Sequence, residues 1–118
     1  MASSTSHNLR GPDGCRYDDS LEVLKITLVI QGIKKKLFHS TNADVQIHSD
    51  QKSMSCTVEI FKLDKKTRTV IDSRFYQVPQ FPGEISSVDF KLETDRCILF
   101  VKKRVPQKWE NSLSQLGL

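Results

Sequence analysis

The sequence has few of the residues from which covalent scaffolds and metal sites are built. Only three cysteines occur in 118 residues, and aromatic residues make up 8% of the chain. Cys15, Cys56 and Cys97 are odd in number and about forty residues apart, so they form neither a close metal-binding pair nor a disulfide framework. We therefore expect reduced thiols, with Cys56 and Cys97 filling the core, in a cytoplasmic or nuclear protein.

Long apolar runs and leader-like segments are also missing. No stretch approaches the ~18 apolar residues that a membrane-spanning helix needs, and residues 1–6 have neither a basic start nor an apolar segment. The sequence therefore predicts neither secretion nor a membrane partner. With 37% hydrophobic and 27% charged residues, it is typical of one small soluble domain with one core, which we expect to be monomeric.

Motifs for catalysis and cofactor binding do not occur either. No glycine-rich loop precedes a helix to hold phosphates, and no nucleophile elbow is found. His7, His39 and His48 cannot be combined with the cysteines at the close spacing of zinc ligands. The carboxylates of Asp18 and Asp19 are expected at the edge of the fold, where water keeps both ionised. We expect no enzymatic activity, no cofactor and no metal.

What the chain does contain is a two-residue alternation of apolar and polar residues. This period predicts half-buried strands, because successive side chains of a strand point to opposite faces. The clearest segment covers residues 24–30, and shorter alternating segments cover 45–47 and 54–60. Residues 69–76 and 85–92 have the composition of strands, and residues 97–101 form an unbroken apolar run that is typical of a buried strand. No segment before residue 107 has a helical period. Six or seven short strands of this kind predict an all-β domain, either an antiparallel sandwich or a barrel.

The ends of the chain differ from this body. Residues 1–16 are rich in Ser, Thr, Asn, Gly and Pro and contain almost nothing apolar, which predicts a flexible N-terminal tail. We place the folded domain at residues 17–113 and a C-terminal tail at residues 114–118. The only tryptophan, Trp109, follows the last predicted strand, and we expect its ring to cover one end of the core.

The end of the chain also carries the most specific pattern. A strand closes with Ile98-Leu99-Phe100-Val101-Lys102-Lys103, and Trp109-Glu110 and Leu113 follow a few residues later. This ending resembles the CS domain, a family named for the CHORD-containing proteins and the SGT co-chaperones that also includes the calcyclin-binding protein. The order of four earlier segments resembles the family too: Tyr17-Asp18-Asp19, Leu24 to Ile30, Asp44-Val45-Gln46-Ile47 and Pro82 to Val88.

The resemblance covers about residues 15–113. It implies a seven-stranded antiparallel β-sandwich without catalytic activity, which binds other proteins and commonly the ATPase end of heat-shock protein 90. Such a module serves as an adaptor in a co-chaperone or in a larger scaffold protein.

The resemblance also implies a binding face. In the SGT members two aromatic residues and a lysine contribute to it, and these positions fall here on Asp18, Val29 and Lys103, so only the lysine is kept. We expect Lys102, Lys103 and Arg104 to meet acidic groups of the partner while Val29 fills the contact centre. Asp18 and Val29 lack the rings of the SGT members, and losing an aromatic ring at an interface can cost ~2 kcal/mol or more. A partner other than heat-shock protein 90 therefore stays open. A ubiquitin-ligase component or a sister domain of the same polypeptide are examples.

A hypothesis from a different class is a nucleic-acid-binding β-barrel of the OB type. The formal charge of +4 permits an acidic partner. Such a barrel needs exposed aromatic rings for base stacking beside basic residues. Phe38, Phe61, Phe75 and Tyr76 are the candidates. We expect a protein partner rather than a nucleic acid, and keep this hypothesis as the alternative.

Overall fold

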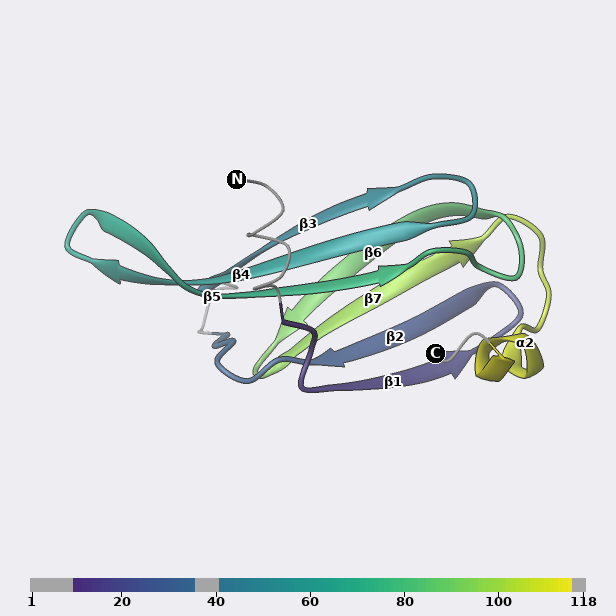
Figure 1. The fold of residues 1–118 in the computed structure, drawn as a ribbon, viewed down its shortest axis with the longest axis horizontal. Coiled ribbons are helices and arrows are strands. Elements are labelled where there is room, and N and C mark those ends of the chain that lie inside the picture. The colour runs from purple at the N-terminus through teal and green to yellow at the C-terminus, as the bar shows by residue number, and fades with distance from the viewer. Residues whose placement is uncertain (1–9, 36–40, 116–118) are drawn as a thin grey trace.

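The computed structural model describes residues 10–35 and 41–115, and the side chains of these residues up to 113. Within these ranges the chain forms strands followed by one short helix (Figure 1). They are β1 (Gly14–Asp19), β2 (Val23–Val29), β3 (Ala43–Ser49), β4 (Met54–Asp64), β5 (Thr67–Val78), β6 (Ile85–Glu93), β7 (Arg96–Lys103) and α2 (Glu110–Gln115). Every pair of neighbouring strands is antiparallel, so the predicted all-β antiparallel fold is confirmed.

The strands form two separate layers. One sheet has the order β1-β2-β7-β6, and the other has the order β3-β4-β5. The two sheets face each other and do not close into one ladder (Figure 1). The fold is therefore the seven-stranded sandwich, and the alternative of a closed barrel is wrong.

The core lies between the sheets and is built by the alternation seen in the sequence. Inward side chains of β2, β4 and β7 are almost completely buried: Leu24, Ile26, Leu28, Met54, Cys56, Val58, Ile60, Cys97, Leu99 and Val101. A hydrogen bond with the Cys56 thiol, and then burial, raise the pKa of Cys97 above its ordinary value of 9.0. The same hydrogen bond lowers the pKa of Cys56. Both side chains lie in the core and are at most 1% exposed, so the core role expected of both cysteines is confirmed.

Residues 10–16 belong to the fold, so the predicted tail boundary at residue 16 is wrong. Strand β1 begins at Gly14, which pairs with Val29 of β2. Before it, the Arg74 guanidinium of β5, in a residue only 6% exposed, donates to the Asp13 carboxylate at 2.9 Å and to the Gly11 carbonyl at 3.0 Å. Hydrogen bonds rather than apolar burial hold this segment, and no hydrophobic pattern reveals it. Residues 1–9 lie outside the described residues.

The predicted C-terminal boundary also shifts. The carbonyl of Trp109 accepts hydrogen bonds from the backbone N–H groups of Ser112 and Leu113, and helix α2 continues to Gln115. The first two residues of the predicted tail are therefore helical. Among the described residues, no helix is long and apolar enough to cross a membrane.

The environment of Asp13 predicts a pH dependence of stability. A hydrogen bond from the Gln31 backbone N–H, and then one from Arg74, lower the pKa of Asp13 below its ordinary value of 3.8. The pKa of Asp13 is therefore lower in the folded than in the unfolded protein. The ionised carboxylate stabilises the fold fully above the unfolded pKa, and this stabilisation is lost as the pH falls through the folded pKa. We expect the free energy of unfolding of Asp13→Asn to depend less on pH than that of the wild type below about pH 4.

Urea denaturation at several pH values would measure this difference. Asp64→Asn, an exposed carboxylate at the last residue of β4, is the matched control and should keep the wild-type pH dependence. An equal pH dependence for Asp13→Asn and the wild type would contradict the role given to Asp13.

Candidate interaction face

The outer face of the four-stranded sheet is built by the residues that alternate with the core. In β2 these are Val23, Lys25, Thr27 and Val29. The ladder places Asp18 and Arg16 of β1 opposite Lys25 and Thr27, and Phe100 and Ile98 of β7 opposite the same two residues on the other side. Charged and apolar side chains from three strands therefore share one face.

Three of the five predicted contact residues lie on this face. Asp18 is opposite Lys25, Val29 is opposite Arg96, and Lys102 is opposite Val23. Lys102 of β7 is level with the first residue of β2, and Val29 is the last residue of β2. The two are about 20 Å apart along the strands, for six residues at ~3.3 Å each. The structure thus brings these residues to one face but not to one spot. Arg104 follows β7, is exposed, and donates its backbone N–H to the Glu84 carbonyl at 3.0 Å.

Lys103 does not lie on this face, and its predicted role as an exposed partner contact is wrong. It follows Lys102 by one residue in β7, so it points to the opposite side, where its side chain is 0% exposed. Its Nζ donates to Asp19 Oδ1 at 2.5 Å and to the carbonyls of Ser20 and Gln107 at 2.6 and 2.5 Å. A buried lysine needs such acceptors, because an unpaired charge is very costly away from water.

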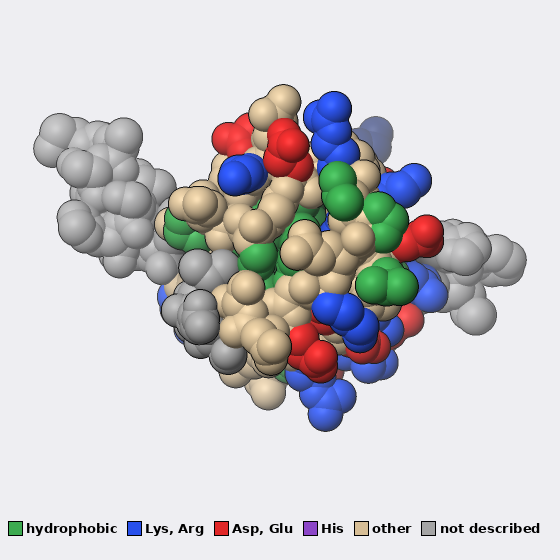
Figure 2. All heavy atoms as spheres, turned by 90° about the vertical axis from the view of Figure 1, so that its right-hand side faces the viewer, with side chains coloured by type: hydrophobic (Ala, Val, Ile, Leu, Met, Phe, Trp, Pro, Cys, Tyr) green, Lys and Arg blue, Asp and Glu red, His purple; other side chains and the backbone are tan. Residues whose placement is uncertain are grey.

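The same ion pair holds the C-terminal segment against the core. Asp19, which we expected in water, has a side chain only 2% exposed, and its Oδ2 accepts the Trp109 backbone N–H at 2.6 Å. Lys103 Nζ lies 4.5 Å from the centre of the Trp109 ring, and Phe81 stacks on this ring with centroids 5.7 Å apart. Trp109 is 2% exposed, so the predicted cap is confirmed. Figure 2 views this end of the molecule, where apolar side chains remain visible among polar and charged ones.

Replacing Lys103 tests the buried ion pair. Lys103→Ala leaves the Asp19 carboxylate buried without its cation, so we expect the free energy of unfolding to fall by about 3–5 kcal/mol. Lys102→Ala is the matched control, because its side chain is exposed one residue away, and should change stability by less than about 0.5 kcal/mol. Urea denaturation followed by Trp109 fluorescence would measure both. Equal stability of the two variants would contradict the buried pair.

A double variant separates the pair from its parts. Lys103→Met together with Asp19→Asn removes both charges, and no single ion is then left buried. We expect this double variant to lose less stability than the sum of the two single variants, because each single change strands the remaining charge. Additive losses in the same denaturation experiment would show that the two side chains act independently.

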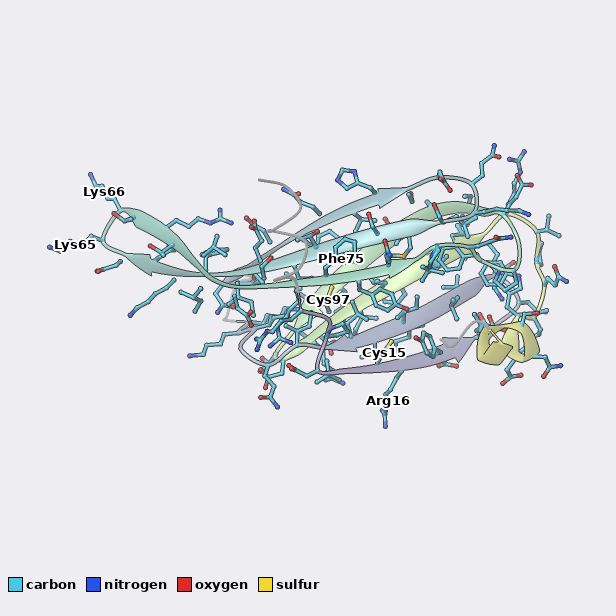
Figure 3. All side chains as sticks on the ribbon, in the orientation of Figure 1. Cys15, Arg16, Lys65, Lys66, Phe75 and Cys97 are labelled. Carbon is cyan, nitrogen blue, oxygen red and sulfur yellow. The ribbon has the colours of Figure 1, made fainter. Side chains whose placement is uncertain are left out.

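The outer face has an apolar centre, which we call the outer strip: Val23, Thr27, Val29, Ile98 and Phe100. Ile98 is 6% exposed and the other members are half-buried. Exposed charges flank the strip on both sides, with Arg16 and Asp18 in β1 and Asp89 and Lys91 in β6. Beside it, over β1 and β2, lies a shallow hollow of about 420 Å³. Figure 3 shows Arg16 pointing away from the sandwich below β1.

The sequence did not identify Phe100 as a residue of the outer face. The unbroken apolar run of residues 97–101 indicated a strand buried on both faces. The signal that corrects this lies across the ladder: Phe100 is opposite Lys25 on one side and Asp89 on the other. Charged neighbours in register mark a solvent-facing row, and that register is readable only once the strands are paired.

The rings proposed for base stacking do not share one surface. Phe61 is buried, with the Arg68 guanidinium carbon 3.8 Å from its ring centre. The Tyr76 hydroxyl lies 3.3 Å from the Tyr17 hydroxyl at the side of the sandwich where β1 and β5 are the edge strands. Phe75 alternates with inward-facing residues of β5 and is half-buried on the outer side of the other sheet (Figure 3). Phe38 lies outside the described residues.

Comparisons with known proteins assign no family. The sequence matches no protein-family model, and no curated protein matches it. Among the described residues, no group of three or more His, Cys, Asp or Glu side chains could hold a metal ion. The features that bear on function are therefore the outer face itself and the pattern of residues along the chain.

Proposed function

We propose that this chain is a non-enzymatic protein-interaction domain of the CS type, an adaptor or co-chaperone module whose partner binds the outer face of the four-stranded sheet. The observation that carries the proposal is the outer strip, a row of mainly apolar and mostly half-buried side chains between charged residues. Protein interfaces have this arrangement, in which an apolar centre excludes water and a polar rim sets orientation and specificity.

Phe100 is the side chain we expect to contribute most to binding. It is the aromatic member of the strip, and aromatic side chains dominate the energetics of protein interfaces. It lies two strands from Asp18 in the same cross-strand row, with Lys25 between them. A ring from β7 would therefore serve the face on which the SGT co-chaperones carry rings at the positions of Asp18 and Val29.

The candidate partner is the ATPase domain of heat-shock protein 90, as the resemblance implies. The exposed cations Lys25, opposite Phe100 within the strip, and Lys102, opposite Val23 at its end, would meet acidic groups of that partner. One observation favours a different protein partner: Asp18 and Val29 replace the two rings of the SGT members. A ubiquitin-ligase component or a sister domain would use the same face, so one set of variants tests both possibilities.

Phe100→Ala should weaken partner binding by at least about tenfold, because truncating an interface ring can cost ~2 kcal/mol. Phe75→Ala is the matched control, since this ring is half-buried on the outer side of the other sheet. Isothermal titration calorimetry against the heat-shock protein 90 ATPase domain would measure affinity, and circular dichroism would verify that both variants fold.

If the ATPase domain does not bind the wild type, the same variants are compared against proteins that the wild type captures from lysate. Capture that Phe100→Ala abolishes and Phe75→Ala leaves intact would identify a different partner on the proposed face. Equal capture by wild type and Phe100→Ala, or loss only with Phe75→Ala, would contradict the proposed face.

A further inference from the structure

The hairpin of β4 and β5 extends beyond the sandwich at one end of the molecule, and we call residues 61–71 the arm (Figure 1). The register shifts where the arm leaves the sheet: Ile60 pairs with Asp72 and Phe61 with Val70, so Ile71 is an extra residue in a bulge. Bulges bend and twist a ribbon away from its sheet. The tip is the turn at Lys65 and Lys66, which Figure 3 places farthest from the sandwich.

The arm exposes aliphatic side chains to an unusual degree. Leu63, Val70 and Ile71 are 66%, 47% and 61% exposed, and they make up half of the large hydrophobic residues that are exposed in the described part of the chain. Leu63 pairs with Arg68, and Val70 pairs with Phe61 on the same stretch of ribbon. The three aliphatic residues therefore lie within a few residues of one another on a projecting element.

The arm is also strongly cationic. It contains four cations and one carboxylate, and Lys62, Lys65 and Lys66 are exposed. Arg68 is not available in the same way, because its guanidinium pairs with Asp44 and covers the Phe61 ring. The cations that are free to meet a partner are therefore lysines at the tip and beside Leu63.

The backbone at the tip is unfavourable for the residue that occupies it. Lys65 has φ of 58°, in the left-handed region that Gly or Asn adopts far more readily. Folding alone would favour one of those residues at this turn. The turn places the Lys65 cation at the outermost point of the arm (Figure 3).

We propose that the arm binds an anionic phospholipid surface, with Lys62, Lys65 and Lys66 contacting lipid phosphates while Leu63, Val70 and Ile71 enter the headgroup region. Lysines beside exposed aliphatic side chains are the combination that holds proteins at such surfaces. A membrane surface needs no complementary pocket, only cations and apolar groups on a projecting element. The expectation of no membrane partner depended on the lack of a spanning segment, which surface binding does not require.

The composition of the arm favours lipid over other acidic partners. The centres of protein interfaces are enriched in Trp, Tyr and Arg and depleted in Lys, whereas the arm exposes lysines and aliphatic residues. Single-stranded nucleic acid requires exposed rings for base stacking, and the ring of the arm, Phe61, is buried under Arg68. The arm is also distinct from the outer strip, so this proposal does not depend on the proposed function.

Vesicle co-sedimentation with the full chain tests the proposal. We expect binding to phosphatidylcholine vesicles that contain about 30% phosphatidylserine, little binding to pure phosphatidylcholine, and weaker binding at higher salt. Lys65→Glu with Lys66→Glu should lower the partition coefficient by more than about tenfold, since each lysine near an anionic surface contributes about fivefold. The control, Lys52→Glu with Lys108→Glu, makes the same change in net charge at two exposed lysines away from the arm and should retain binding within about twofold.

A second pair of variants tests the apolar contribution. Leu63→Ser with Ile71→Ser should lower vesicle binding by at least about threefold, whereas Leu21→Ser with Val105→Ser, exposed in loops at the opposite end of the molecule, should not. Circular dichroism would verify that all four variants fold. Absence of binding to the anionic vesicles, or equal losses for arm and control variants, would overturn the proposal. Arm-dependent binding to RNA or an acidic protein, with none to vesicles, would overturn it as well.

Discussion

The buried pair of Lys103 and Asp19 connects more of the molecule than any of the other ion pairs described. It joins β7 to the end of β1, and Lys103 also donates to the carbonyls of Ser20 and Gln107. Asp19 in turn accepts the backbone N–H of Trp109. Burying two ions carries a large desolvation cost, which only close geometry and filled hydrogen-bonding sites can offset. Because both side chains have these partners, the C-terminal segment stays in place and Trp109 seals the end of the core.

This pair also determines which residues of β7 lie on the outer face of the sheet. Successive side chains of a strand alternate, so with Lys103 inside, Lys102 must lie outside, and Phe100 and Ile98 share its face. A slip of one residue in β7 would expose Leu99 and turn Lys102 toward the inner side of the sheet. The internal ion pair and the outer strip are therefore two consequences of one register.

The strands were predictable where apolar burial forms them and not where hydrogen bonds do. Residues 24–30 and 54–60 alternate because each second side chain enters the core. β1 carries charged and small residues and is held by ladder bonds to β2, so no hydrophobic pattern marks its start at Gly14. Lys103 was misplaced for a related reason: charged side chains are expected outside, and the partner that pairs with it lies 84 residues away in the sequence. Only the fold brings these two charges together.

The sheet face and the arm differ in what constrains their sequences. Residues of the outer strip lie on strands whose opposite sides form the core, so a change there also affects folding. The arm leaves the sandwich at the bulge, and Leu63, Val70 and Ile71 are exposed to solvent. Stability therefore does not explain why this hairpin keeps exposed aliphatic residues or a lysine at a positive φ, since polar residues and glycine would fold at least as well. The proposed lipid contact would account for both features, and the hairpin extends beyond the sandwich that carries the outer strip (Figure 1).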